Sequence, residues 1–221
     1  MYSKYNVQYL KSFIVLVSCL VWLSSSLCAH AGIYEDLMEA VKADDPVKLV
    51  ALLKRGGDVD SVDRNGNTLL IQAAGDGKAE VVKALLASHA KIEARNRYGE
   101  TALMLASIHG HTAVVRHLLA QGAQINHPGW TPLMFAAIQG RVDVAKLLIA
   151  QGADVNAASD NGTTALMLAA KESSLEMVLL LLQHGADPNR KNETGATALG
   201  FAVDNGKRDI GETLIKAGAV D

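Results

Sequence analysis

This sequence has few cysteines and few aromatic residues, and neither sign of charge is in large excess. Its two cysteines, Cys19 and Cys28, both lie in the first 31 of 221 residues, so the remaining chain can form no disulfide and no thiolate metal site. Only 5% of residues are aromatic, and 21 basic residues nearly balance 23 acidic ones. That balance excludes a polybasic nucleic-acid binder, and an apolar content of 49% excludes a disordered chain.

Known catalytic motifs are missing as well. The chain has no Gly-x-Ser-x-Gly, no phosphate-binding loop of the G-x-x-x-x-G-K-[ST] type and no His-Glu-x-x-His. His109, His111 and His117 lie close together in sequence, but no nearby Asp, Glu or Cys completes a ligand set. We therefore expect no enzymatic activity, no cofactor and no bound metal.

The first 31 residues differ from the rest. Lys4 and Lys11 are their only charges, and they precede the apolar run SFIVLVSCLVWL and then SSSLCAHA. This order predicts a cleavable signal peptide over residues 1–31, and a spanning helix would need roughly 20 apolar residues. We expect an exported protein, periplasmic in a bacterium. A lipid anchor at Cys19, a retained membrane anchor and full secretion are the alternatives.

The rest of the chain is an internal repeat. Threonines that precede Ala-Leu, Pro-Leu or Leu-Leu are spaced by 33, 30, 33 and 33 residues, at positions 68, 101, 131, 164 and 197. Each unit contains a short apolar segment, a break, and then paired apolar residues such as Val114 and Leu118 at helical spacing. A glycine such as Gly122 follows, as expected where a helix ends in a left-handed residue. The pattern predicts two helices in each unit.

One unit, Gly129–Asn156, reads GWTPLMFAAIQGRVDVAKLLIAQGADVN. It resembles the ankyrin repeat, and the resemblance extends over residues 34–221. It implies an all-α solenoid of six stacked helix-turn-helix repeats with short β-turn fingers, forming one domain over residues 32–221. The implied repeats span about 34–62, 63–95, 96–126, 127–158, 159–191 and 192–221. Buried alanines at 73, 74, 106, 136, 137, 169, 170 and 202 would let the first helices pack closely.

Two departures from the family pattern carry structural expectations. His89 stands where the second unit should have its terminating glycine, which predicts a strained left-handed residue. The segment from the Asn of each finger, or the residue that replaces it, to the next Gly has the same length in other units, as in Asn156–Gly162, but is three residues shorter in Asn126–Gly129. This shortened finger predicts a notch in the row of fingers, with Trp130 at its edge.

Trp130 has two possible roles. It could fill the space vacated by the shortened finger by packing on Tyr98 or its neighbours. It could instead be an exposed anchor for a partner, since tryptophan and tyrosine are enriched at binding hot spots. The resemblance places partner contacts on the concave face, formed by the finger tips and the ends of the first helices. The predicted partner-binding residues are Arg64, Asn65, Arg97, Tyr98, Glu100, Ile108, His109, Trp130, Ile138, Gln139, Asp160, Lys171 and Glu172.

Within that set, Tyr98, Ile108, Trp130 and Ile138 are expected to form an apolar centre with the charged residues as a rim. The predicted function is a non-enzymatic, monomeric scaffold that binds a partner protein. Nucleic acid is not expected as a partner, nor a membrane span after signal cleavage. The alternatives are a stable protective or structural partner of one envelope enzyme, and a secreted effector.

Overall fold

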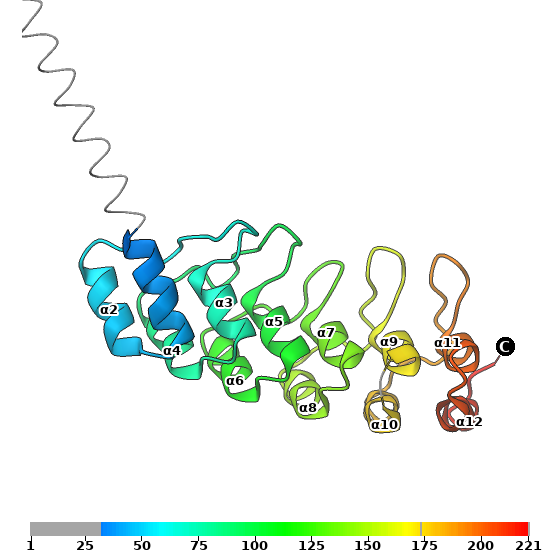
Figure 1. Cartoon of the computed structure of the whole chain (residues 1–221). Coiled ribbons are helices and arrows are strands. Elements are labelled where there is room, and N and C mark those ends of the chain that lie inside the picture. The colour runs from blue at the N-terminus through cyan, green and yellow to red at the C-terminus, as the bar shows by residue number, and fades with distance from the viewer. Residues whose placement is uncertain (1–31, 173, 221) are drawn as a thin grey trace, which may run out of the picture.

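The computed structural model describes residues 32–172 and 174–220 (Figure 1). The predicted signal peptide, residues 1–31, lies outside the described residues. Residues 32–42 are helical. They are followed by α2 (Pro46–Lys54), α3 (Leu69–Gly75), α4 (Ala79–Ala87), α5 (Ala102–His109), α6 (Thr112–Ala120), α7 (Pro132–Ile138), α8 (Val142–Ala150), α9 (Ala165–Glu172), α10 (Leu175–Gln183), α11 (Ala198–Asp204) and α12 (Arg208–Lys216).

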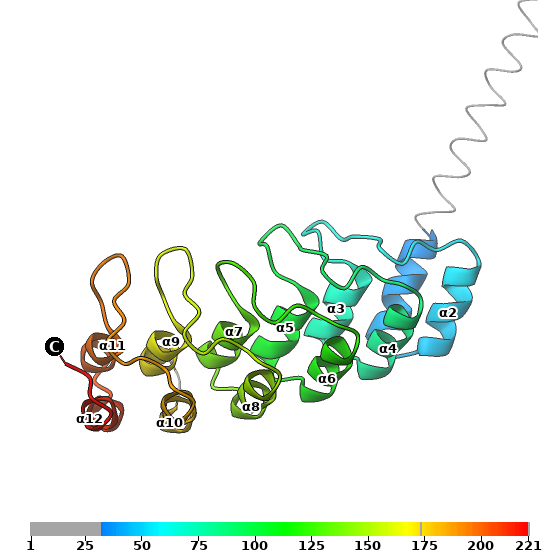
Figure 2. The ribbon, with the colours of Figure 1, turned by 180° about the vertical axis from the view of Figure 1, so that it is seen from behind.

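The helices form two layers. The inner layer contains α3, α5, α7, α9 and α11, each packed on the next, and the outer layer runs from α2 through α4, α6, α8 and α10 to α12. Each inner helix also contacts the outer helix that follows it in sequence. The loops that precede the inner helices all project from the same side of this stack (Figures 1 and 2). The predicted all-α solenoid is therefore confirmed.

The repeated threonines start the inner helices. Thr68 is the N-cap of α3, with its side-chain oxygen accepting a hydrogen bond from the Ile71 N–H at 3.2 Å. The threonines before α5, α7, α9 and α11 accept the equivalent bond over 3.1–3.4 Å. A free N–H in the first turn is thereby satisfied, which stabilises a helix by about 1 kcal/mol. The spacing of the threonines thus sets where each inner helix begins.

Left-handed residues follow most of the described helices. Gly110 and Gly122 have φ of 80° and 83° after α5 and α6. His89 adopts φ of 62°, which confirms the strained residue predicted in the second unit. Asp44 is a second non-glycine example, with φ of 53°, and its carboxylate accepts a hydrogen bond from the Val81 N–H at 3.3 Å. Aspartate tolerates this conformation better than most residues, because its short polar side chain forms local hydrogen bonds.

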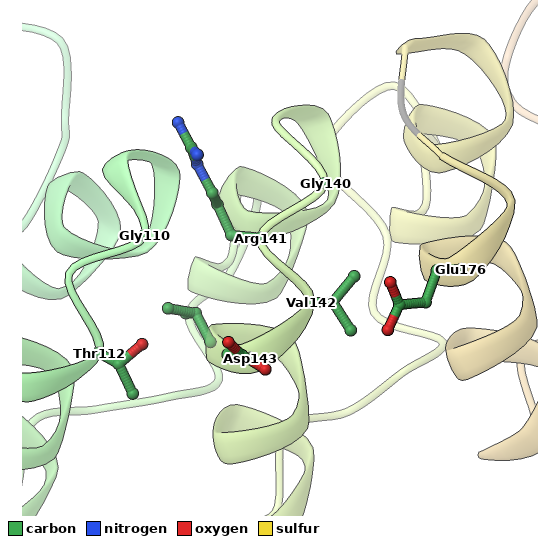
Figure 3. Close-up of a pocket in the computed structure, with 8 residues that line it drawn as sticks. Gly110, Thr112, Gly140, Arg141, Val142, Asp143 and Glu176 are labelled. Carbon is green, nitrogen blue, oxygen red and sulfur yellow. The ribbon is translucent and has the colours of Figure 1, made fainter.

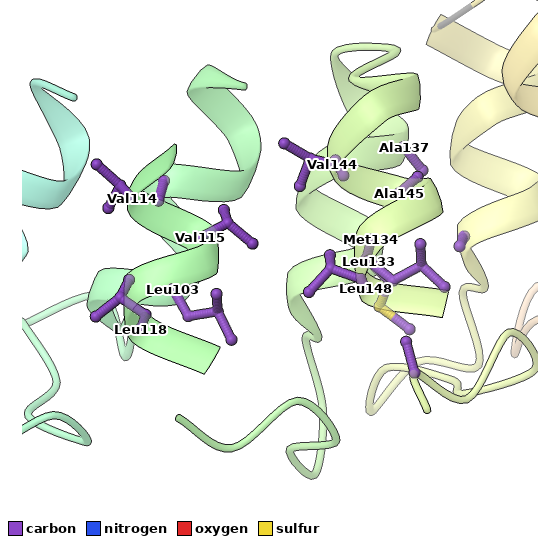
Figure 4. Packing of buried hydrophobic residues seen from close by; sticks show 14 of the residues in the cluster. Leu103, Val114, Val115, Leu118, Leu133, Met134, Ala137, Val144, Ala145 and Leu148 are labelled. Carbon is purple, nitrogen blue, oxygen red and sulfur yellow. The ribbon is translucent and has the colours of Figure 1, made fainter. Parts of the chain in front are cut away.

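One apolar core runs through the helix layers. The eight inner-helix alanines named above are all fully buried, as the sequence predicted. Leu118 of α6 and Leu148 of α8 are also fully buried, and Figure 4 shows such side chains meeting between the two layers. Each unit shares this core with its neighbours, so no helix pair buries its apolar surface by itself.

Candidate functional site

At five junctions between units, one polar side chain at the base of a finger accepts a hydrogen bond from a backbone N–H of the next unit. Asn126 Oδ1 accepts a hydrogen bond from the Asp154 N–H at 2.9 Å, and Asn156 Oδ1 accepts one from the Asp187 N–H at 2.9 Å. The same contact joins Asp60 to Lys91, Glu93 to Gln124 and Asn189 to Val220. Asn126 therefore keeps its structural position, and the missing residues lie between it and Gly129, as the sequence predicted.

The full-length fingers close on themselves. In the finger 96–100, Asn96 Oδ1 accepts from the N–H groups of Tyr98 and Glu100 at 2.9 and 3.0 Å. The Gly99 N–H donates to the Asn96 carbonyl at 3.0 Å. Asp63 and Asn192 accept the equivalent backbone bonds in the fingers 63–67 and 192–196. These loops satisfy their own polar groups, so a finger can project into solvent without support from a sheet.

Adjacent full-length fingers also meet at their tips. The Arg97 N–H donates to the Asn65 carbonyl at 3.0 Å, and the Glu193 N–H donates to the Asn161 carbonyl at 2.9 Å. Burial by itself would raise the pKa of Asp63. Hydrogen bonds from the Asn67 side chain and from backbone N–H groups outweigh it and hold that pKa below its usual value. Residues 127–130 form the shortened finger between these two joined pairs.

His127, the first residue of the shortened finger, is buried. Its side chain is only 2% exposed, and its Nδ1 lies 2.8 Å from Nη2 of Arg95. A guanidinium can only donate, so Nδ1 is the acceptor and the ring proton is on Nε2. Nε2 lies 3.4 Å from the Glu93 carboxylate, without hydrogen-bond geometry to any described residue. Arg95 Nη1 donates to the Gly99 carbonyl at 2.8 Å, so Arg95 connects the finger 96–100 to the shortened one.

The electrostatics favour a neutral His127. Burial lowers its pKa below the usual value, and the Arg95 guanidinium lowers it further. The Glu93 carboxylate and the Gln124 backbone act in the opposite direction but do not reverse the shift. The hydrogen bond from Arg95 and the lowered pKa therefore agree on an uncharged ring.

An open groove of about 450 Å³ lies beside the shortened finger. Trp130 is 41% exposed and Tyr98 is 74% exposed. The Trp130 ring packs edge-on against Phe135, with 5.8 Å between ring centroids, so among the described residues its ring partner is Phe135 rather than Tyr98. The lining consists of Arg95, Tyr98, Gly99, Glu100, Met104, Pro128, Gly129, Trp130, Phe135, Ile138 and Asp160.

The groove brings together five of the thirteen predicted binding residues: Tyr98, Glu100, Trp130, Ile138 and Asp160. Ile108 was expected in the apolar centre, but it does not line the groove, and its carbonyl accepts from Arg141 Nε at 3.0 Å. Arg64, Asn65 and Arg97 are exposed on the earlier fingers, and His109, Gln139, Lys171 and Glu172 are exposed at the ends of inner helices. Lys171 and Glu172 form an ion pair with each other at 2.9 Å.

The sequence did not identify Arg95, His127 or Phe135 as site residues. Phe135 follows Thr131 by four positions, where the other units hold Gln72, Leu105, Leu168 and Phe201, so its aromatic side chain was a weak signal. No signal marked Arg95, because its partners lie in two different fingers.

A polar hollow of about 490 Å³ lies at the turns that lead into the outer helices α6 and α8, around Arg141, Asp143 and Glu176 (Figure 3). The Arg141 side chain supports the preceding turn through its bond to Ile108. His111 does the same one unit earlier, with Nε2 at 2.9 Å from the Gly75 carbonyl. Among residues 32–172 and 174–220, no three His, Cys, Asp or Glu side chains are grouped as a metal site.

Comparison with known proteins gives the family. A family model for ankyrin repeats, in three copies, matches residues 37–128, 122–192 and 158–221. These matches cover more than half of the chain, so the chain belongs to the ankyrin-repeat family, whose members generally mediate protein–protein interactions. No curated protein is significantly similar to it. In the part of the chain that the structure describes, no helix has the length and apolar character to cross a membrane.

Proposed function

We propose that this chain is a non-enzymatic, monomeric scaffold that binds a partner protein on the face formed by the fingers and inner helices. The groove between Tyr98 and Trp130 is the centre of contact. The observation that supports this most directly is the exposure of two large aromatic side chains around one open hollow. Exposed tyrosine and tryptophan contribute disproportionately to protein interfaces.

The rest of the face supplies the rim. Arg64 and Arg97 place positive charges near the tips of the early fingers, while Asp160 and Glu193 place negative charges near the tips of the later fingers. A partner of ordinary size covers about 800 Å² on each side, which exceeds the groove and requires contacts with neighbouring fingers. Charged rim residues of this kind set orientation and association rate more than affinity.

The test is affinity capture followed by a binding measurement with the purified captured protein. The bait is the full chain, compared with a groove variant carrying Tyr98→Ala, Trp130→Ala and Ile138→Ser. A matched control carries Arg116→Ala and Leu179→Ser, which alter exposed side chains on the outer helices α6 and α10. Circular dichroism checks that all three chains fold.

We expect the groove variant to lose the captured protein and the outer-helix control to keep it. Retention by both variants would overturn the proposed face. A captured envelope enzyme that unfolds or loses activity without the scaffold would identify the protective-partner alternative. A partner found only in host extracts would identify the secreted effector.

We also propose export through residues 1–31 with cleavage after Ala31, so that the working protein begins at Gly32 and resides in a bacterial periplasm. The support is the order of two lysines, an apolar run of about 12 residues and a small-residue Ala-His-Ala end. Mass spectrometry of the N-terminus after fractionation tests this. A mature chain that begins with a lipid-modified Cys19 would replace cleavage at Ala31 with a lipid anchor.

A further inference from the structure

The walls of the groove are apolar, but two carboxylates line it. Glu100 and Asp160 both border the hollow, against one base, Arg95. Arg95 already donates two hydrogen bonds, from Nη1 to the Gly99 carbonyl and from Nη2 to His127 Nδ1. The lining therefore holds one more acid than base, and its base is already hydrogen-bonded.

The two carboxylates differ in the hydrogen bonds that they accept. Glu100 Oε2 accepts a hydrogen bond from Asn96 Nδ2 at 2.8 Å, which fixes that side chain. Asp160 is exposed and accepts no hydrogen bond from any residue in the described ranges. A Cβ placed on Gly129 would lie 3.4 Å from Asp160 Oδ1, so the Asp160 carboxylate sits directly over the shortened finger. A full-length finger behaves differently: a Cβ on Gly66 would meet the backbone and stem of Arg97.

We propose that the groove receives a lysine or arginine side chain from an extended, basic segment of the partner protein. The apolar stem lies between Tyr98 and Trp130, and the charged end reaches Asp160 and Glu100. This deepens the proposed function, on which it rests, by stating the chemistry of the partner. Long basic side chains bury an apolar stem while their charge stays near solvent and acids, and a cation over an aromatic face gains further stabilisation.

Other occupants fit the groove less well. An acidic segment would face Asp160 and Glu100 and be repelled. A purely apolar side chain would bury the Asp160 carboxylate with no partner, which is unfavourable. A basic side chain packs its stem against the aromatic walls and pairs its charge with the Asp160 carboxylate.

The test uses three capped pentapeptides, Gly-Leu-X-Leu-Gly, with arginine, norleucine or glutamate at X. Each is titrated into the full ¹⁵N-labelled chain while the indole N–H signal of Trp130 is followed. The chain has two tryptophans, and the signal lost in Trp130→Phe identifies the correct one. Asp160→Asn removes the unpaired charge, and Glu193→Gln removes one equal charge on the adjacent finger, outside the groove lining.

We expect the arginine peptide to bind roughly tenfold more tightly than the norleucine peptide, as an added cation–π and ion-pair contact would give. The preference should fall to about threefold or less in Asp160→Asn and persist in Glu193→Gln. Equal binding of the arginine and norleucine peptides, a full preference in Asp160→Asn, or no movement of the Trp130 signal would each overturn the inference. The capture experiment is independent: loss of the partner from the groove variant with no basic preference would sustain the proposed function and refute only this deeper step.

Discussion

The fingers 96–100 and 127–130 precede neighbouring helix pairs, α5–α6 and α7–α8, yet they are built differently. The first closes on itself through Asn96 and carries Tyr98 at its tip. The second has lost that loop and instead buries His127 against Arg95. The helices below are unaffected, since Leu118 and Leu148 are equally buried in α6 and α8.

The difference shows that the two parts of a repeat are under separate constraints. The helices must match their neighbours along the whole stack, because every unit shares its core with the next. A finger satisfies its backbone groups within itself and at the tip of the adjacent finger, so its length can change without disturbing the helices. The shortened finger then creates the groove, because the full-length loop that would project between the fingers 96–100 and 159–163 is absent.

The largest expected effects test whether the neighbouring helix pairs α5–α6 and α7–α8 are equally well packed. Leu118→Ala and Leu148→Ala should each lower the free energy of unfolding by about 2–5 kcal/mol, because each removes a fully buried side chain from the shared core. Urea unfolding of both variants measures this. A much smaller loss for Leu148→Ala would show that the unit with the shortened finger is more loosely packed than its neighbour.

The next comparison concerns the finger glycines. Gly162 and Gly129 have φ of 78° and 76°, so alanine at either position carries a left-handed penalty of about 1–2 kcal/mol. A Cβ on Gly162 would also lie 3.0 Å from Asn192 Cα, whereas on Gly129 it meets the movable Asp160 side chain at 3.4 Å. We expect Gly162→Ala to destabilise more than Gly129→Ala in thermal unfolding. The reverse order would mean that the shortened finger is the more rigid one.

A smaller effect tests the tethers at the base of the fingers. Asn126→Ala and Asn156→Ala each remove two hydrogen bonds to the following unit, to Asp154 and Gly152 and to Asp187 and Gly185. Each substitution should lower the free energy of unfolding by about 1 kcal/mol, since these groups are exposed and water replaces part of the interaction. Unfolding midpoints in urea would show it. If Asn126→Ala were neutral, the tether next to the shortened finger would carry no stability.

The smallest effect appears only at acid pH and is confined to the shortened finger. Because the pKa of His127 is lower in the folded chain than its usual 6.5, the unfolded chain binds the proton first as the pH falls. The stability contributed by neutral His127 is thus complete above about pH 6.5 and is lost as the pH falls from there through the folded pKa. Unfolding curves across this range should show that loss.

The His127→Asn variant should lack this part of the pH dependence, and His109→Asn, which alters an exposed histidine, should retain it. A pH profile that is the same in His127→Asn and the unmodified chain would contradict the assignment of a neutral, buried ring.

Much of the fold could be predicted from the sequence because its signals are local and repeated. The threonine spacing located the inner helices, and the alanine pattern located their close contacts. The strained residue at His89 followed from one glycine missing from a regular series. The deletion after Asn126 was also visible as a change in spacing. The sequence does not decide between the two roles of Trp130, because a spacing says nothing about the direction of a side chain.

The sequence by itself determined the repeat, the threonines that precede the inner helices and the position of the notch. The tertiary structure decided what surrounds the notch: His127 buried against Arg95, Phe135 packed on Trp130, Ile108 outside the groove, and Asp160 with no hydrogen-bond partner among the described residues. The physical reason is that these contacts join residues about 30 positions apart or depend on side-chain direction. Helix periodicity and turn chemistry act over a few residues, whereas the groove exists only once neighbouring units have stacked.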